Sequence, residues 1–253
     1  MTDIENGEAG FISSLGHLRI GQSVRAIQLI EYNPNAYKDT LYRLYKLQAP
    51  VTLATWLPKR RAQFLAGRLA AKYALNSSES LSKRSLGETT QEISIGKYRE
   101  PIWPRNLTGS ISHSHQLSIA TVKHQATDRS GIGLDIQSLI DQKMQHEIAS
   151  TILTQSDSAL MKQSVSGLSE SMLFTLIFSA KESFFKAFFS TAGNYFGFDA
   201  VSVTEVDIDS SELTLKTTSN LASHIPLGFE VKVAFTTLNE PDTQIITLCD
   251  WEL

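Results

Sequence analysis

The stretch Ser169–Phe189 reads SESMLFTLIFSAKESFFKAFF and predicts a long, apolar-rich helix with a charged insert. Charged side chains are costly to bury unless they are paired or have a function, which draws attention to Lys181, Glu182 and Lys186. Glu182 and Lys186 are four residues apart and share a face of the predicted helix. A solvated Glu–Lys pair is the alternative, and it would stabilise the helix only slightly. The surrounding phenylalanines favour the functional interpretation.

The segments on either side of this helix predict a mixed α+β chain. After it, apolar and polar residues alternate in the way expected of antiparallel hairpins. Before it, PKRRAQFLAGRLAAKYAL (Pro58–Leu75) predicts a second helix, with Pro58 suited to the first turn. Each half therefore has a helix with ionic residues followed by strands, and an internal duplication and a chance likeness both remain open. The other predicted helices are near Lys38–Lys46 and over Gln145–Ile152 and Ser158–Gln163; the predicted strands are Ser23–Tyr32, Glu92–Ile95, Gly109–Val122, Gly131–Ile136, Ala200–Asp207, Glu212–Thr217, Gly228–Thr236 and Gln244–Trp251, and Asn76–Thr90 is expected to be turn-like.

The composition excludes several classes of protein. A chain of 253 residues with one cysteine, Cys249, cannot be a disulfide scaffold or hold a cysteine-based zinc site. A formal net charge of −3 argues against sequence-independent nucleic-acid binding, which needs clustered positive charge. The start, MTDIENGEAG, is unlike a signal peptide, and no run approaches the ~20 apolar residues of a membrane helix. We therefore expect a soluble, cytoplasmic protein without a membrane span, and a monomer.

Asp135 and Gln137 lie in the apolar run GIGLDIQ, which predicts a strand. Residues i and i+2 of a strand point to the same face and lie about 6.6 Å apart. Both side chains can therefore reach one small ion or ligand group. The alternative, which this run alone favours, is that Asp135 ends the strand and caps the residues after it.

Basic residues form an edge on the helix that begins at Pro58, and such an edge can bind phosphate. In an ideal helix Arg61 and Arg68 are about 20° apart, whereas Arg60 and Arg68 are about 80° apart. Helical geometry therefore prefers Arg61 beside Arg68. A solvated basic face is the alternative. Arg99 lies further along the chain and could extend the same positive region.

The segment GSISHSH contains Ser112 and His113, on or beside a predicted strand. Two histidines at i and i+2, with no cysteine and no third histidine nearby, argue against a zinc site. His113 is better explained as a donor to a phosphate oxygen or as a core residue. The chain has no phosphate-binding Gly-x-x-x-x-Gly-Lys loop, no complete dinucleotide fingerprint and no nucleophile elbow, so ATP hydrolysis and redox chemistry lose support.

Five motifs, taken in order, resemble the 4′-phosphopantetheinyl transferases of the siderophore- and surfactin-synthesis type, most closely the enterobactin synthase component D branch. The order and spacing are specific, although each motif alone is not. The resemblance implies an α+β fold of two similar halves about a pseudo-twofold axis, each a helix packed on a small antiparallel sheet. The motifs are KRRAQFLAGRLAA (Lys59–Ala71), REPIWP (Arg99–Pro104), GSISHS (Gly109–Ser114), GLDIQ (Gly133–Gln137) and FSAKESFFKA (Phe178–Ala187).

The resemblance also implies a reaction. Coenzyme A would bind between the halves with Mg²⁺ on its pyrophosphate, and its phosphopantetheine arm would pass to a serine of an apo carrier protein, releasing adenosine 3′,5′-bisphosphate. Asp135, Gln137 and Glu182 match the metal ligands, and Glu182 the general base, acting directly or through water. Lys186 would neutralise charge on the leaving phosphate. The positions that match coenzyme A contacts are Arg60, Arg68, Arg99, Ser112, His113, Lys181 and Lys186.

Gln137 departs from the family pattern, which usually has Asp-x-Glu where this chain has Asp135 and Gln137. The amide removes one negative charge, so we expect weaker metal binding rather than loss of activity. An alternative is a coenzyme A-binding or carrier-docking homologue that has lost catalysis. We expect an N-terminal segment over residues 1–22, a phosphate-binding half over 23–125 and a half with the metal and catalytic residues over 126–253. The carrier protein could belong to a peptide, polyketide, fatty acid or siderophore synthase.

Overall fold

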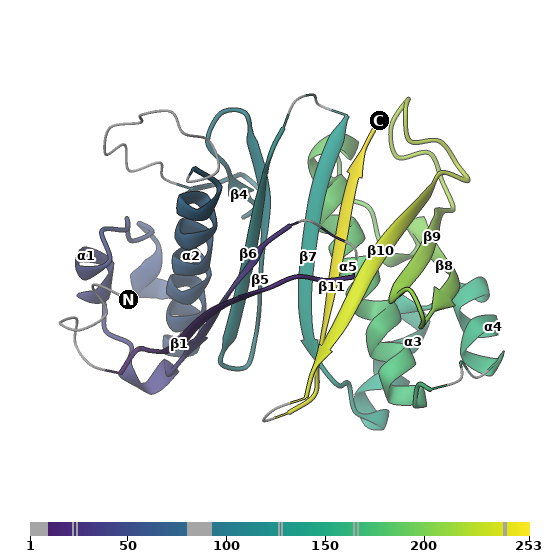
Figure 1. Ribbon diagram of the computed structural model, residues 1–253, viewed down its shortest axis with the longest axis horizontal. Helices are drawn as coiled ribbons and strands as arrows, with labels where there is room; N and C mark the ends of the chain where they lie inside the picture. The colour runs from purple at the N-terminus through teal and green to yellow at the C-terminus, as the bar shows by residue number, and fades with distance from the viewer. Residues whose placement is uncertain are drawn as a thin grey trace. The chain divides into compact units, whose positions relative to one another are not determined.

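A computed structural model describes residues 10–21, 23, 25–79, 93–125, 127, 129–163, 165, 167–239 and 242–253 (Figure 1). The chain divides into two compact units. The first unit comprises Met1–Leu18 and Ala26–Lys123, and the second comprises Arg19–Arg25 and His124–Leu253. The short segment Arg19–Arg25 therefore belongs to the second unit, although it precedes most of the first.

The first unit contains a four-stranded sheet with the strand order β1-β2-β6-β5, and a long helix, α2, packs on β2 and β5. The core lies between sheet and helix, where Ile30, Leu65 and Leu69 are buried. A two-stranded ribbon of β3 and β4 precedes β5. The elements are β1 (Ile12–Leu18), β2 (Ile27–Tyr32), η1 (Pro34–Ala36), α1 (Leu41–Leu44), η2 (Leu53–Thr55), α2 (Pro58–Glu79), β3 (Ser94–Ile95), β4 (Pro101–Ile102), β5 (Leu107–Ser114) and β6 (Leu117–His124).

Three predictions for the first unit need correction. The segment Gly109–Val122, predicted as one strand, is a hairpin of β5 and β6 that turns at His115, whose φ of 48° is left-handed. No glycine or proline marks this turn, so composition could not reveal it. The second correction is that α2 continues through Asn76 to Glu79; the remainder of the predicted turn-like segment lies outside the described residues. The third is that β1 lies within residues 1–22, which had been assigned to neither half.

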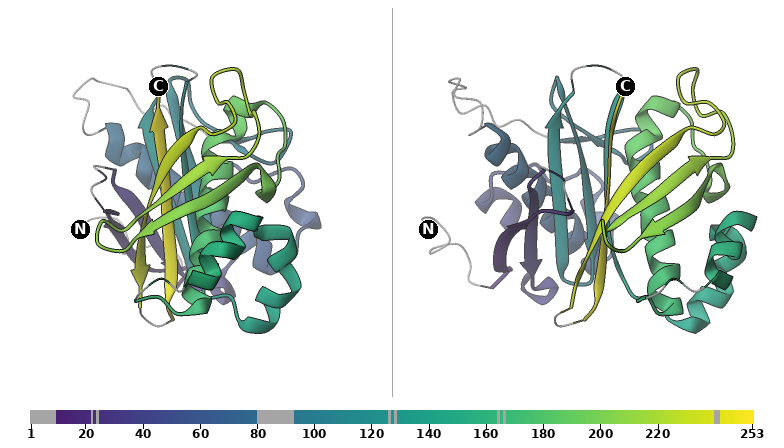
Figure 2. Two further views of the ribbon diagram at one scale, coloured as in Figure 1. Left: turned by 90° about the vertical axis from the view of Figure 1, so that its right-hand side faces the viewer. Right: turned by 45° about the vertical axis from the view of Figure 1, so that its right-hand side comes forward.

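The second unit contains a five-stranded antiparallel sheet with the order β7-β11-β10-β9-β8, and β7 is at its edge. The helix α5 lies along one face of this sheet, chiefly against β7 and β11, and α3 and α4 contact α5 (Figure 2). The elements are β7 (Ser130–Ser138), α3 (Gln142–Ile152), α4 (Gln155–Gln163), α5 (Glu170–Ala192), η3 (Phe198–Ala200), β8 (Val201–Asp207), β9 (Glu212–Thr217), β10 (Glu230–Leu238) and β11 (Gln244–Glu252).

Local sequence explains the ends of α5. The Ser169 side chain accepts a hydrogen bond from the Met172 backbone N–H at the start of the helix. Gly193 ends the helix in a left-handed conformation with φ of 68°, which glycine adopts without strain. Between these caps the apolar residues face the sheet, and Leu176, Ile177, Ala180 and Phe184 are buried.

Two glycines of β7 allow α5 to approach the strand closely. A Cβ atom at Gly133 would lie 1.8 Å from the Ser183 carbonyl oxygen, and one at Gly131 would lie 2.0 Å from the Ala187 carbonyl oxygen. Side chains alternate along a strand, so Asp135 and Gln137 share the face of Gly131 and Gly133. The glycines therefore bring this face of β7 directly against the helix.

The predicted α+β class is confirmed, and each unit has an antiparallel sheet packed on a long helix. The twofold relation between the halves stays a prediction. No helix within the described part of the chain is both long enough and apolar enough to span a membrane.

Candidate functional site

Asp135 lies on β7, at 5% exposure, and both of its carboxylate oxygens accept hydrogen bonds from α5. Oδ2 accepts from the Ser179 hydroxyl at 2.8 Å, and Oδ1 accepts from the Lys186 ammonium at 2.7 Å. Thr247 of β11, which pairs with Asp135 in the sheet, contacts the Ser179 hydroxyl at 2.9 Å. The strand continues to Ser138, so the alternative that Asp135 ends and caps the strand is wrong.

Glu182 lies on α5 and is partly buried. Burial raises the pKa of its carboxyl; the positive charge of Lys186 opposes this shift, and the negative charge of Asp135 adds to it. Asp135 and Lys186 are therefore close enough to act on Glu182 electrostatically. Gln137 is half-buried and follows Asp135 on the same face of β7. The structure thus brings two carboxylates, one amide and one ammonium to the contact between β7 and α5.

Lys186 of α5 contacts the strand β7, which the sequence alone could not reveal. Besides Asp135, its ammonium donates to the Leu134 carbonyl oxygen at 3.0 Å. The predicted alternative was a solvated pair with Glu182 on the helix surface. The side chain is only partly exposed and binds the strand, so Lys186 belongs to the same cluster as Asp135.

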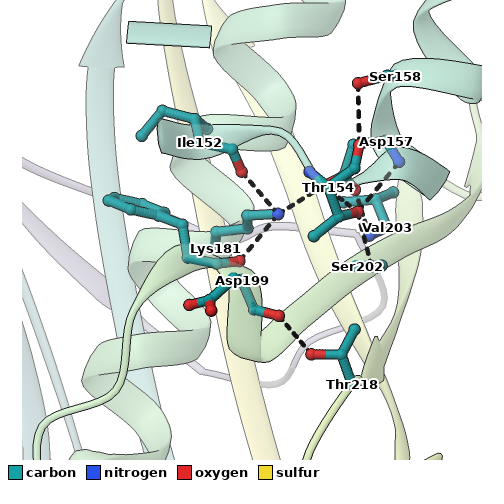
Figure 3. A network of polar contacts seen from close by, with 10 residues as sticks. Ile152, Thr154, Asp157, Ser158, Lys181, Asp199, Ser202, Val203 and Thr218 are labelled. Carbon is teal, nitrogen blue, oxygen red and sulfur yellow. Dashed lines mark hydrogen bonds and ion pairs between the residues drawn. The ribbon is translucent and has the colours of Figure 1, made fainter. Parts of the chain in front are cut away.

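Lys181 is buried inside the second unit. The residue is 1% exposed, and its ammonium donates to Ile152 O at 2.8 Å, Asp157 Oδ2 at 2.5 Å and Phe198 O at 3.0 Å (Figure 3). An ammonium has three N–H donors, and these contacts use all of them. In the structure Lys181 therefore has no N–H left over for the predicted phosphate contact, which stays a prediction.

A small cavity of about 70 Å³ lies beside Glu182. Half of its lining residues are aromatic, and Glu182 supplies a carboxylate. The segment that follows α5 contributes much of the lining, including the exposed Tyr195. The lining residues are Lys181, Glu182, Phe185, Tyr195, Phe196, Gly197, Phe198 and Val201.

In the first unit the structure distinguishes Arg60 from Arg61. The Arg61 guanidinium donates to the backbone oxygens of Trp56 and Ala54 at 2.9 and 2.8 Å, which ties it to the loop before α2. Arg60 is exposed, and its Nη1 lies 2.9 Å from His113 Nε2 on β5. The guanidinium can only donate, so Nε2 of His113 is the acceptor in this hydrogen bond. Helical geometry alone had preferred Arg61 beside Arg68, whereas the contacts favour Arg60.

Arg68 is 8% exposed, and its Nη1 has no hydrogen-bond partner among the described residues. Its Nη2 donates to Ser94 O at 3.3 Å, and its guanidinium lies 4.7 Å from the centre of the Phe64 ring. Burial lowers the pKa of Arg68 to about 10. A buried donor without an acceptor is unusual and costly. An incoming anion would satisfy it.

The other two predicted phosphate contacts differ in exposure. Ser112 is buried on β5, next to His113. Arg99 is exposed on the turn between β3 and β4, where its φ of 69° is left-handed. Its backbone N–H donates to Gly96 O at 3.1 Å, which closes the turn.

The donor chemistry of Asp135, Gln137 and Glu182 suits Mg²⁺. This ion typically takes one or two carboxylates, with waters and substrate phosphates completing six oxygen ligands. The set here supplies two carboxylates and an amide oxygen. Among the described residues there is no group of three or more histidine, cysteine, aspartate or glutamate side chains that could hold a metal. A metal at this site would therefore rely on ligands from substrate and water.

Comparison with known proteins gives the class of this chain. Residues 49–123 match the model of the 4′-phosphopantetheinyl transferase N-terminal domain, and residues 131–239 match that of the 4′-phosphopantetheinyl transferase superfamily. The chain belongs to the 4′-phosphopantetheinyl transferase family, as its motifs predicted.

The chain is similar in sequence to several individual proteins of this family. The chain is 31% identical to enterobactin synthase component D of Salmonella typhimurium (strain LT2) over 207 residues, which cover 76% of this chain and 77% of the relative. It is 36% identical to enterobactin synthase component D of Escherichia coli (strain K12) over 142 residues, covering 52% and 61%. It is 29% identical to 4′-phosphopantetheinyl transferase Npt of Nocardia iowensis over 161 residues, covering 63% and 66%.

Sequence reasoning missed the residues that support the charged cluster. Ser179 donates to Asp135 and is itself in contact with Thr247, and Asp157 binds Lys181. One signal was present for Asp157, because Thr154 and Asp157 have the spacing of a capping box before a helix. Ser179 and Thr247 lie in different elements, and no local pattern connects them.

Proposed function

We propose that this protein transfers the 4′-phosphopantetheine arm of coenzyme A to a serine of an apo carrier protein, releasing adenosine 3′,5′-bisphosphate. The observation that carries the proposal is the cluster at the contact of β7 and α5, where Asp135, Glu182 and Lys186 act on one another. Family membership supports the same reaction. The carrier could be a peptidyl, aryl or acyl carrier domain.

In the proposed mechanism the serine hydroxyl attacks the phosphorus that bears pantetheine. A bond forms from the serine oxygen to that phosphorus, and the bond to the bridging pyrophosphate oxygen breaks. Glu182 accepts the hydroxyl proton directly or through water, and its raised pKa suits a general base that works near neutral pH. Lys186 is a cation beside the same carboxylates and would stabilise negative charge on the leaving phosphate.

Asp135, Gln137 and Glu182 would hold Mg²⁺ in this proposal. When bound, the ion would neutralise charge on the pyrophosphate. Asp135 already has its orientation, because Ser179 holds Oδ2. Its Oδ1 accepts from Lys186, and a carboxylate oxygen retains acceptor capacity for a further ligand.

The first unit would bind the phosphates of coenzyme A. The buried Nη1 of Arg68 supports this, since it has no hydrogen-bond partner within the described part of the chain and an anion would satisfy it. Arg60 and His113 form a contact that can open to admit a phosphate oxygen, Arg99 lies on the turn between β3 and β4, and Ser112 lies on β5. A cytoplasmic location and a monomeric state stay predictions.

The test is incubation of the purified protein with coenzyme A, Mg²⁺ and a panel of apo carrier proteins, followed by intact-protein mass spectrometry. A mass gain of one phosphopantetheine on a carrier is expected. Glu182→Ala should abolish the gain, whereas Glu170→Ala, an exposed glutamate at the start of the same helix, should retain it. No gain across the panel, with coenzyme A still bound, would favour the alternative of a binding protein that has lost catalysis.

A further inference from the structure

Lys181 is the centre of a buried polar network in the second unit (Figure 3). Its ammonium binds the last residue of α3 through Ile152 O, the first turn of α4 through Asp157, and η3 through Phe198 O. The side chains of Lys181 and Asp157 are both fully buried. One ammonium therefore joins three segments that are separate in sequence to the middle of α5.

Asp157 extends this network to the start of α4 and to the sheet. Its Oδ2 accepts from the backbone N–H and the hydroxyl of Thr154, at 2.7 and 2.8 Å, and the Asp157 N–H donates back to the Thr154 hydroxyl at 3.3 Å. These reciprocal bonds form a capping box. Its Oδ1 accepts from the Val203 N–H of β8 at 2.7 Å. The Thr154 hydroxyl also lies 2.7 Å from that of Ser202.

The network reaches the cavity wall beside Glu182. Tyr195 and Phe196 line the cavity and lie between the end of α5 and η3. Phe198 lines it too, and its carbonyl oxygen is held by Lys181. Lys181 immediately precedes Glu182 in α5. The same ammonium thus connects the helix that carries Glu182 to the segment that faces it.

Stability alone does not account for this ion pair. Removing two charges from water is costly, and a buried pair can often be replaced by apolar residues without loss of stability. Burial lowers the pKa of Lys181, which the charge of Asp157 opposes. Fixing the geometry of a site needs directional bonds, and the bonds of this pair connect α4 and α5, which carry it, to α3, η3 and β8.

We infer that Lys181 and Asp157 are a positioning pair that sets the Tyr195–Phe198 segment against Glu182, and that neither residue contacts substrate. The inference rests on the proposed function for the role of Glu182. It assigns Lys181 to the support of the catalytic helix instead of to coenzyme A. It also adds Asp157, which lies outside the five family motifs, to the residues on which the rate of transfer depends.

The test uses Lys181→Met, Asp157→Asn and the double variant, with the exposed Lys162→Met as the matched control. Lys181→Met alone leaves Asp157 without its cation and can fail to fold, whereas the double variant removes both charges. The double variant should bind coenzyme A with wild-type affinity in calorimetry, while its kcat for transfer falls by about 10- to 100-fold, as expected for a misplaced reacting group. The KM for coenzyme A should stay unchanged.

Amide hydrogen exchange tests the positioning of the Tyr195–Phe198 segment independently of catalysis. The amides of residues 193–198 should exchange faster in the double variant than in Lys162→Met. This result would stand even if the wild type modified no carrier, in which case the proposed function fails and the positioning role does not. The inference is overturned if exchange and kcat are both unchanged. It is also overturned if removal of Lys181 weakens coenzyme A binding tenfold or more while Asp157→Asn does not, since Lys181 would then contact the substrate.

Discussion

At the scale of single residues, the negative charges of Asp135 and Glu182 are stabilised to different extents by their surroundings. Asp135 is held by a hydroxyl and an ammonium at hydrogen-bonding distance. For Glu182, burial outweighs the attraction of Lys186, so its pKa is raised. The folded protein therefore disfavours the ionised form of Glu182, which is the form that a metal ligand and general base must have. Part of the stability of the fold is given up at this position.

Glu182→Gln should therefore stabilise the protein at neutral pH. A raised pKa in the folded state favours folding below the unfolded value of about 4.3, and this advantage is lost as pH rises through the folded value. The variant should resist urea better than the wild type at pH 7 to 8, and the difference should narrow toward pH 5. Glu170→Gln serves as the exposed control. A less stable Glu182→Gln at pH 7 would contradict the assigned pKa shift.

Gln137 is the residue at which this chain departs from the usual acidic pattern. A carboxylate at this position would add negative charge on the face of β7 that carries Asp135. We expect Gln137→Glu to bind Mg²⁺ several-fold more tightly in calorimetric titrations. Gln155→Glu, an exposed position of the same unit, should leave the affinity unchanged. Equal affinities in wild type and Gln137→Glu would show that the amide does not limit metal binding.

At the scale of elements, the site depends on the close contact of α5 with β7. The sequence predicted both elements and the shared face of Asp135 and Gln137. It did not predict that Gly131 and Gly133 on this face admit the helix backbone. Periodicity describes which side a residue faces, but it does not say which neighbour covers that side.

Gly133→Ala should disturb this contact. The added methyl group would meet the Ser183 carbonyl oxygen, a backbone atom that can move only if α5 moves. We expect a loss of about 1–3 kcal/mol in the free energy of unfolding, typical of overpacking, together with reduced transfer. Gly16→Ala in β1, where a Cβ has no neighbour within 4 Å, is the matched control. Urea unfolding and carrier modification measure the two effects, and a fully stable, active Gly133→Ala would contradict the contact.

At the scale of the whole molecule, the candidate phosphate-binding arginines and the candidate metal-binding carboxylates lie in different units. Arg60, Arg68 and His113 belong to the first unit, whereas Asp135 and Glu182 belong to the second. The small net charge of −3 therefore conceals a basic set of candidate residues in the first unit and an acidic set in the second. Phosphate binding and metal binding should consequently respond to different mutations.

Arg68→Met tests this separation and retains much of the side-chain volume. Loss of a charged donor to a phosphate costs about 1.5–3 kcal/mol, so the affinity for coenzyme A should fall by about 10- to 100-fold. Mn²⁺ titration of the coenzyme A-free protein should be unaltered, because its proposed ligands are in the second unit. Arg43→Met, an exposed arginine of the first unit, is the control. Wild-type affinity for coenzyme A in Arg68→Met would remove Arg68 from the binding set.

The sequence by itself determined the family, the α+β class, the long helices near Pro58 and Ser169, and the shared face of Asp135 and Gln137. These follow from motifs and from periodicity, which are properties of neighbouring residues along the chain. Only the tertiary structure decided that Lys181 is buried against Asp157, that Arg60 contacts His113 while Arg61 binds a loop, and that Ser179 connects Asp135 to Thr247. Each of these contacts joins residues from different elements, and a helical angle or a strand alternation carries no information about its partner.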